Sequence, residues 1–139
     1  MTFLRKYLRR SDGASAIEFA IIAPVLAILT VYGFDAWQLI NRKEDMHAAI
    51  NASAHYYMGG GGDDSTASTI GMNGWPNTPG DANLSISRAC SCAGGASDCN
   101  TVCPATQQAP ETRVTIKATD HWNGLHPASL SESETIRVR

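Results

Sequence analysis

The hydrophobic residues of this chain form one long run near the N-terminus, then an amphipathic stretch, then short alternating segments. Within residues 19–34 the only clearly polar side chains are Thr30 and the phenol of Tyr32. Counted from Ala14, the run covers about 20 residues, which as a helix span the ~30 Å hydrocarbon core of a bilayer. A chain this short and Gly-rich could hardly enclose such a helix in a soluble core. We therefore predict a membrane-spanning helix over residues 14–34.

The helical pattern continues beyond this run. Residues 35–58 contain no Pro or Gly, and apolar side chains recur at helical spacing opposite a polar face. This predicts an amphipathic continuation of the same helix that ends at the four glycines of residues 59–62. Pro24 and Gly33 are expected to kink or weaken the helix. The predicted apolar face is Leu39, Met46, Ile50, Ala54 and Tyr57, and the polar face is Gln38, Arg42, Glu44, Asp45 and Asn51.

The remaining residues, 59–139, are predicted to form one small β domain. By composition residues 59–82 are a loop, which Trp75 and Ile70 could tie back to the domain. Three later stretches alternate apolar and polar residues, as strands with one wet face do. The predicted fold class is therefore α+β, a long N-terminal helix with a small antiparallel sheet packed on its C-terminal half. The predicted strands are residues 83–88, 113–118 and 134–139.

The charge distribution orients the predicted membrane helix. Residues 1–13 carry four basic side chains against Asp12, a charge of +3, whereas the net charge is −2, so the rest carries −5. Basic residues favour the cytoplasmic side of a membrane helix, which would place the C-terminal domain in the periplasm of a bacterium. Small residues precede the apolar run instead of following it, which argues against an ordinary cleaved secretory signal. Nothing in the charge indicates nucleic-acid binding.

Four cysteines are clustered between the first two predicted strands, at Cys90, Cys92, Cys99 and Cys103. They could bind zinc as four thiolates or form two disulfides. An even count in a small domain with little core, in an oxidising compartment, favours disulfides that stiffen a hairpin tip. A bridge between Cys90 and Cys92 would be strained, so we expect a nested or a crossed pairing.

The sequence gives no sign of an enzyme, a metal centre or a cofactor site. His121 and His126 flank a predicted turn at residues 123–124 without an acidic partner motif. The glycines of residues 59–62 follow a helix, which is the wrong end for binding an anion. The other polar and aromatic candidates are expected to be structural: Asp63 and Asp64 as solvated loop residues, and Trp75 and Trp122 as packing anchors.

The start of the helix carries a recognisable motif. A short basic leader ends at Gly13, and Glu18 is the fifth residue counted from Ala14, followed by Phe19 and the apolar run "AIIAPVLAIL". This arrangement resembles prepilins cut by an aspartic prepilin peptidase. It is most similar to the TadE-like pseudopilins of the tight-adherence (Tad/Flp) pilus, a branch of the type IV pilus superfamily. Phe19 and the long C-terminal body distinguish it from the major Flp pilin, which is very short and typically has Glu-Tyr there.

The resemblance implies a structural protein, cleaved between Gly13 and Ala14 by a prepilin peptidase and anchored in the inner membrane. It implies that Glu18 and Phe19 act in assembly with other Tad pilins and pseudopilins, at the initiation or the tip of an adhesive pilus. A carboxylate one helical turn from the new Ala14 amine could pair with that amine or with a neighbour's. The alternative is an uncleaved single-pass envelope protein whose disulfide-stapled domain binds an extracellular ligand.

Overall fold

The computed structural model describes residues 12–93 and 95–138, with side chains from Ala16 onward except those at the masked positions. The chain separates into two units, residues 1–38 and 39–139. One α-helix, α2 (Asp12–Met58), runs through both, as the continuous helical pattern predicted. Residues 1–11 of the predicted leader lie outside the described residues.

Helix α2 ends at the predicted glycines, which form a compact hydrogen-bonded cap. The amide of Gly61 donates to the carbonyl of Tyr56 at 3.0 Å, and the amide of Gly60 donates to the carbonyl of Tyr57 at 3.0 Å. Gly60 has a φ of 89°, a left-handed conformation that glycine adopts without steric cost. This pattern is a Schellman cap, which satisfies carbonyls that the end of a helix leaves unpaired.

The sheet has four antiparallel strands in the order β2-β1-β3-β4. The three predicted strands are present and longer than expected: β1 is Asn83–Cys92, β3 is Glu111–Trp122 and β4 is Ala128–Val138. The short β2, Gly95–Ser97, was not predicted, and it pairs with the last three residues of β1. Two of the cysteines therefore lie within β1 and not in a loop.

A second helix, α3 (Asp64–Asn73), occupies part of the segment predicted as a loop, so that prediction was wrong. Its Ser, Thr and Gly residues have low helix propensity, and packing supplies what propensity lacks. Gly71 is buried, and a Cβ there would lie 2.2 Å from Ser53 Oγ and 2.3 Å from Leu84 Cδ2. The missing side chain thus lets α3 approach both α2 and the sheet.

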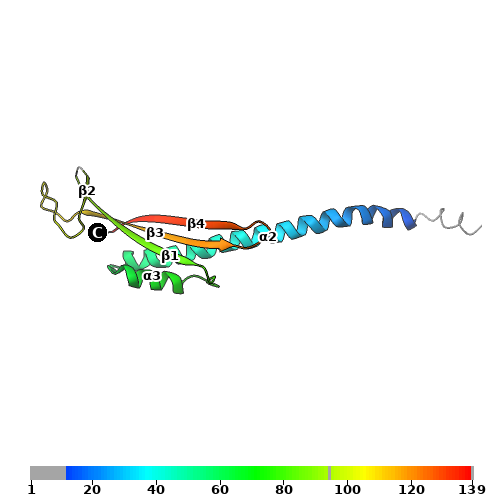
Figure 1. Cartoon of the computed structure of the whole chain (residues 1–139), viewed down its shortest axis with the longest axis horizontal. Helices are drawn as coiled ribbons and strands as arrows, with labels where there is room; N and C mark the ends of the chain where they lie inside the picture. The colour runs from blue at the N-terminus through cyan, green and yellow to red at the C-terminus, as the bar shows by residue number, and fades with distance from the viewer. Residues whose placement is uncertain (1–11, 94, 139) are drawn as a thin grey trace, which may run out of the picture. The chain divides into compact units, whose positions relative to one another are not determined.

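The core lies between the sheet and the helices, which form two layers in the unit of residues 39–139 (Figure 1). Most of the predicted apolar face of α2 is buried there, while Leu39 is partly buried. Trp75 and Trp122 are buried packing residues as predicted, whereas Ile70 is 37% exposed and does not anchor its segment. On β3 and β4 the even-numbered residues face the helices. The core members include Met46, Ile50, Ala54, Tyr57, Val114, Ile116, Ala118 and Leu130.

Candidate functional site

The first candidate surface is the apolar part of α2, which no other described residue covers. In the part of the chain that the structure describes, the one helix long and apolar enough to cross a membrane is this one, and none of its most apolar window is buried. Phe19 is 68% exposed and Ile21 69%. The hydroxyl of Thr30 donates to the carbonyls of Leu26 at 3.0 Å and Ala27 at 2.8 Å. The Thr30 hydroxyl is therefore satisfied inside the helix, as hydrocarbon requires.

The predicted cleavage and assembly residues share the first turns of this helix. The backbone of Gly13 and Ala14 lies in α2, and Glu18 follows Ala14 by about one turn. Glu18 and Phe19 are both exposed. The helix therefore displays an acid and a large aromatic side chain next to each other at its start.

Aromatic side chains lie at the other end of the apolar run. Phe34 and Trp37 pack with ring centroids 5.6 Å apart, and both are more than half exposed. Tryptophan and tyrosine are enriched where membrane helices leave the hydrocarbon. From Glu18 to Trp37 the helix rises about 28 Å, close to the thickness of that core. The signal was visible in the sequence as Tyr32, Phe34 and Trp37.

The second candidate region is the disulfide loop. Cys90 is bonded to Cys99 and Cys92 to Cys103, which is the crossed one of the two expected pairings. All four sulfurs are therefore bonded in disulfides. The alternative zinc site would have required four free thiolates. The loop is closed further by backbone bonds, such as the amide of Cys103 donating to the carbonyl of Gln108 at 2.8 Å.

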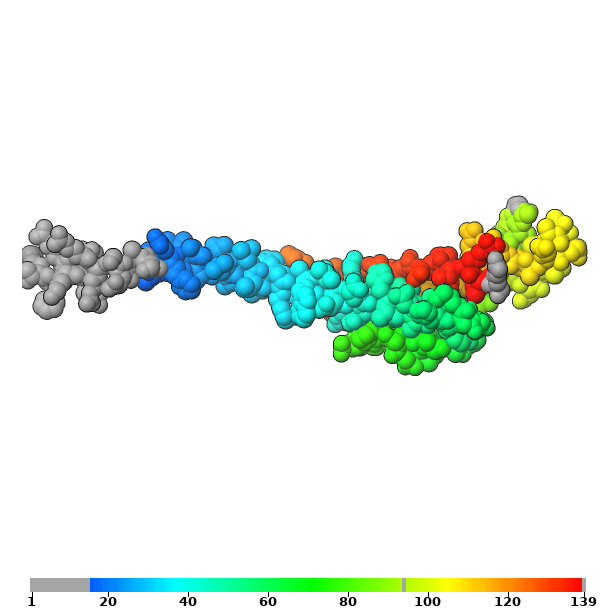
Figure 2. Space-filling view, turned by 180° about the vertical axis from the view of Figure 1, so that it is seen from behind, coloured from blue at the N-terminus to red at the C-terminus, as the bar shows by residue number. Residues whose placement is uncertain are grey.

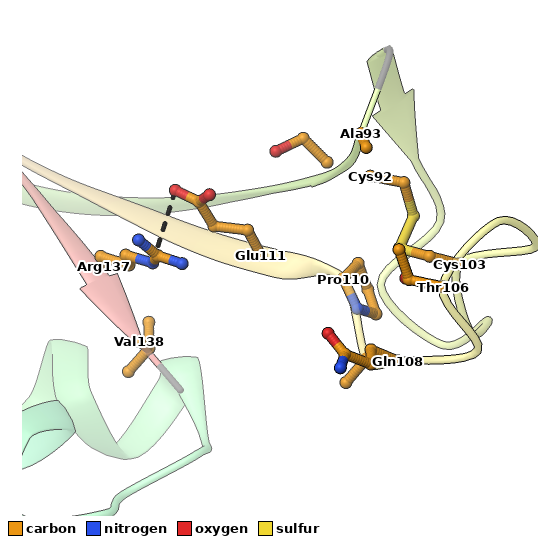
Figure 3. A pocket seen from close by; sticks show the side chains of 11 residues that line it. Cys92, Ala93, Cys103, Thr106, Gln108, Pro110, Glu111, Arg137 and Val138 are labelled. Carbon is orange, nitrogen blue, oxygen red and sulfur yellow. Dashed lines mark ion pairs between the residues drawn. A yellow bond between two sulfur atoms is a disulfide. The ribbon is translucent and has the colours of Figure 1, made fainter.

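A pocket of about 520 Å³ lies between this loop and the ends of β3 and β4. Figure 3 shows the disulfide of Cys92 with Cys103 on one side of it and Glu111 with Arg137 on the other. Glu111 Oε1 lies 3.1 Å from Arg113 Nη2 and 3.5 Å from Arg137 Nε. One carboxylate therefore serves two guanidinium groups, and this corner keeps an excess of positive charge. Nothing in the sequence pattern had indicated a pocket here.

A polar cluster joins the end of α2, the start of α3 and β1. The hydroxyl of Tyr57 donates to Asp64 Oδ1 at 2.6 Å, and Arg88 is paired with the same carboxylate and donates to the carbonyl of Gly62. Burial, with the Asp64 hydrogen bond, raises the pKa of Tyr57 to about 12. The Asp64 bond also raises the pKa of Arg88. Asp64 is thus a structural partner, not the solvated loop residue that we predicted.

Asp63 is also structural, because it caps α3. Its carboxylate accepts hydrogen bonds from the Ser65 hydroxyl at 2.6 Å and from the amide and hydroxyl of Thr66. These bonds, that of Ser65 foremost, lower the pKa of Asp63 to about 2. A cap of this kind satisfies amides that the first turn of a helix leaves free.

An ion pair links α2 to the inner face of the sheet. Arg42 Nη1 lies 3.3 Å from Asp120 Oδ2, and the guanidinium lies 6.0 Å from the centroid of the Trp122 ring. The Asp120 side chain is fully buried and that of Arg42 is 34% exposed. Burial raises the pKa of Asp120. Arg42 had been placed on the polar face, so this contact corrects its predicted role.

Within residues 12–93 and 95–138, no group of three or more His, Cys, Asp or Glu side chains is arranged to hold a metal ion. His121 lies in β3 on the outer face of the sheet, and His126 lies in the connection to β4. The Arg42–Asp120 and Arg88–Asp64 pairs instead tie helices to strands.

Comparison with known proteins gives one match. Residues 13–55 match the family model described as TadE-like protein. The match begins at Gly13 and includes Glu18, the apolar run and most of the amphipathic part of α2. It confirms the resemblance seen in the sequence. Neither a curated protein nor a solved structure matches the chain.

Proposed function

We propose that the chain, whose residues 13–55 match the TadE-like family model, is a minor pilin or pseudopilin of a tight-adherence pilus. The family indicates a part in the Tad pilus system, and such proteins are structural. The proposed role is in the initiation or the tip of the pilus and in its adhesion. Other Tad pilins and pseudopilins would be its partners through the N-terminal helix.

The observation that carries this proposal is the uncovered apolar helix with an acid near its start. A soluble monomer would leave this run of large apolar side chains in water, at a cost of roughly 25 cal/mol per Å². A bilayer covers such a surface before assembly, and neighbouring helices cover it in a filament. We propose that residues 14–34 lie first in the bilayer and later among neighbouring helices of the filament. Residues 35–58 would then hold the folded unit outside the inner membrane.

The proposed role of Glu18 follows from the cost of a charge near hydrocarbon. A prepilin peptidase cutting after Gly13 would create a positive amine on Ala14, about one helical turn away. An acid in such surroundings needs a partner, and the amine of the same or a neighbouring subunit supplies one. Pairing between subunits would also fix their axial register. The leader of residues 1–13 would end in the cytoplasm and residues 39–139 in the periplasm.

The experiment that tests this role is Glu18→Gln in cells that assemble the pilus. We expect normal processing of the precursor but an about tenfold loss of the chain from the sheared pilus fraction, because the amide cannot neutralise the amine. Immunoblots of the membrane and pilus fractions measure both.

Glu44→Gln is the matched control, because Glu44 is an exposed acid on the same helix beyond the apolar run. It should enter pili as the parent chain does. Equal incorporation of the Glu18 and Glu44 variants would contradict the assembly role of Glu18.

A second candidate function rests on the pocket beside the disulfide loop. An uncleaved envelope protein that binds an extracellular ligand would use such a pocket. This alternative requires residues 1–13 to remain on the mature chain, so the N-terminus of the mature protein separates it from the pilin proposal.

A further inference from the structure

Strand β4 is the outer strand of the sheet among the described residues, with β3 on one side of it only. In an antiparallel strand, alternate residues point their backbone N–H and C=O groups away from the neighbour. These groups form a ready template for a further strand. Figure 2 shows β4, in red, reaching the surface beside the end of α2.

The middle of β4 is protected against such pairing, whereas its end is not. Charged side chains that point inward are a common protection of sheet edges. Glu132 and Glu134 point to the helix side, and Glu132 Oε1 lies 3.2 Å from Lys43 Nζ. Beyond them, Ile136 and Val138 point to the same side without a charge. The part of β4 beyond Glu134 therefore lacks this protection, and we call these residues, 135–138, the "distal edge" of β4.

The inner side of the distal edge is hollow and apolar. A pocket of about 300 Å³ is lined there by the apolar side chains of Ile136, Val138, Tyr57 and Met58, and also by Gly60 and Arg137. Ile136 and Val138 are only partly buried, and Met58 is 66% exposed. An apolar side chain placed beside them would remove this surface from water.

The outer side of the distal edge is hollow and basic. Arg137 lines the pocket of about 520 Å³, and Arg113 is its direct partner on β3. Glu111 neutralises one of these two cations, so one positive charge remains. Both guanidinium groups are more than 60% exposed and can reach an added acid. As Figure 3 shows, the disulfide-held loop forms the far wall of this pocket.

We propose that the distal edge of β4 binds an extended peptide segment of another protein, added as a further strand. Residues of an added strand alternate between the two faces, so those on one side would enter the apolar hollow and those on the other would meet Arg137. The matching segment alternates apolar with acidic residues. The disulfides then have a functional consequence, because they hold one wall of the outer pocket. This inference uses only residues 39–139 and does not depend on the role of the N-terminal helix.

The probe is a fluorescent synthetic peptide that alternates valine and glutamate, titrated with the full chain in detergent micelles. We expect saturable binding, and added protection from hydrogen exchange for those amides of residues 135–138 that point away from β3. Arg137→Glu should weaken binding about tenfold and favour a valine–lysine peptide instead, because the outer charge is reversed.

Lys117→Glu makes the same charge change on the same face of the sheet, farther along β3, and should leave binding unchanged. Two peptides, one N-methylated on its valines and one on its glutamates, separate the two sets of amides. Methylation of the set that faces β4 should abolish binding, whereas methylation of the other set should not. Absence of binding, equal binding by the Arg137 and Lys117 variants, or full binding by both methylated peptides would overturn the proposal.

Discussion

Gly71→Val is expected to destabilise residues 39–139 by about 3 kcal/mol, as overpacking of a tight interior site does. Any Cβ at this position lies 2.2 Å from Ser53 Oγ, 2.3 Å from Leu84 Cδ2 and 3.0 Å from the carbonyl oxygen of Ala49. The two side chains could turn away only by giving up their own contacts. Ser53 Oγ donates to the Ala67 carbonyl at 2.9 Å, which is one of the bonds holding α3 on α2.

The measurement is denaturant unfolding of the full chain in micelles, followed by the fluorescence of the buried tryptophans. Gly80→Val is the matched control, because a Cβ at Gly80 meets nothing within 4 Å. Its midpoint should stay close to that of the parent. If the Gly71 and Gly80 variants unfold at the same denaturant concentration, the docking of α3 described above is wrong.

Arg42→Met is expected to cost about 2 kcal/mol at neutral pH. The substitution leaves the fully buried carboxylate of Asp120 without its cation, and an uncompensated buried charge is strongly destabilising. This expected loss of stability is smaller than that for breaking a wholly buried ion pair, because Arg42 is itself partly exposed. A second acid, Asp81, faces Asp120 and adds to the cost.

The loss of stability caused by Arg42→Met should increase with pH. Burial raises the pKa of Asp120 in the folded chain, so the protonated form is favoured there. The destabilisation by Arg42→Met should therefore be smallest below the ordinary aspartate pKa and should grow as the pH rises through the folded value. Stability curves of the parent and the variant at several pH values measure this.

Asp120→Asn provides the control for the same pair. The amide oxygen can still accept the hydrogen bond that Asp120 Oδ1 receives from the His121 amide at 2.8 Å, but it carries no charge. The double variant Arg42→Met with Asp120→Asn should regain most of the stability lost by Arg42→Met alone. A double variant no more stable than the single one, or a loss independent of pH, would show that the charge of Asp120 is not the cause.

Periodic patterns of apolar residues in the sequence predicted helix α2 and the three long strands. The buried face of α2 is readable because Met46, Ile50, Ala54 and Tyr57 recur at helical spacing, and four glycines end the helix. The strands are readable because apolar and polar residues alternate along β1, β3 and β4. Tertiary pairing then extended each strand beyond the alternating residues.

Helix α3 was missed because its stability comes from contacts distant in sequence. Its residues, "DSTASTIGMN", favour turns and caps in isolation, and its buried face is made of small residues, Ala67 and Gly71, instead of an apolar stripe. The Asp63 cap was a readable signal, since aspartate is one of the residues preferred at the N-cap of a helix.

The candidate sites also differ in whether they are formed by consecutive residues or by residues distant in the sequence. The start of α2 was predictable because its chemistry lies within six consecutive residues, from Gly13 to Glu18, and the family match covers it. The Arg42–Asp120 pair joins residues 78 apart, and the distal edge of β4 depends on the sheet order. No local pattern encodes either, so only the folded arrangement reveals them.

We propose that the mature chain begins at Ala14 as a cleaved pilin-like subunit. Intact mass spectrometry of the protein from pilus-assembling cells tests this proposal. We expect one dominant mass, that of residues 14–139 with both disulfides formed, and for Gly13→Leu the mass of the uncleaved chain. Retention of residues 1–13 on the unaltered protein would show that the chain is not a cleaved pilin-like subunit.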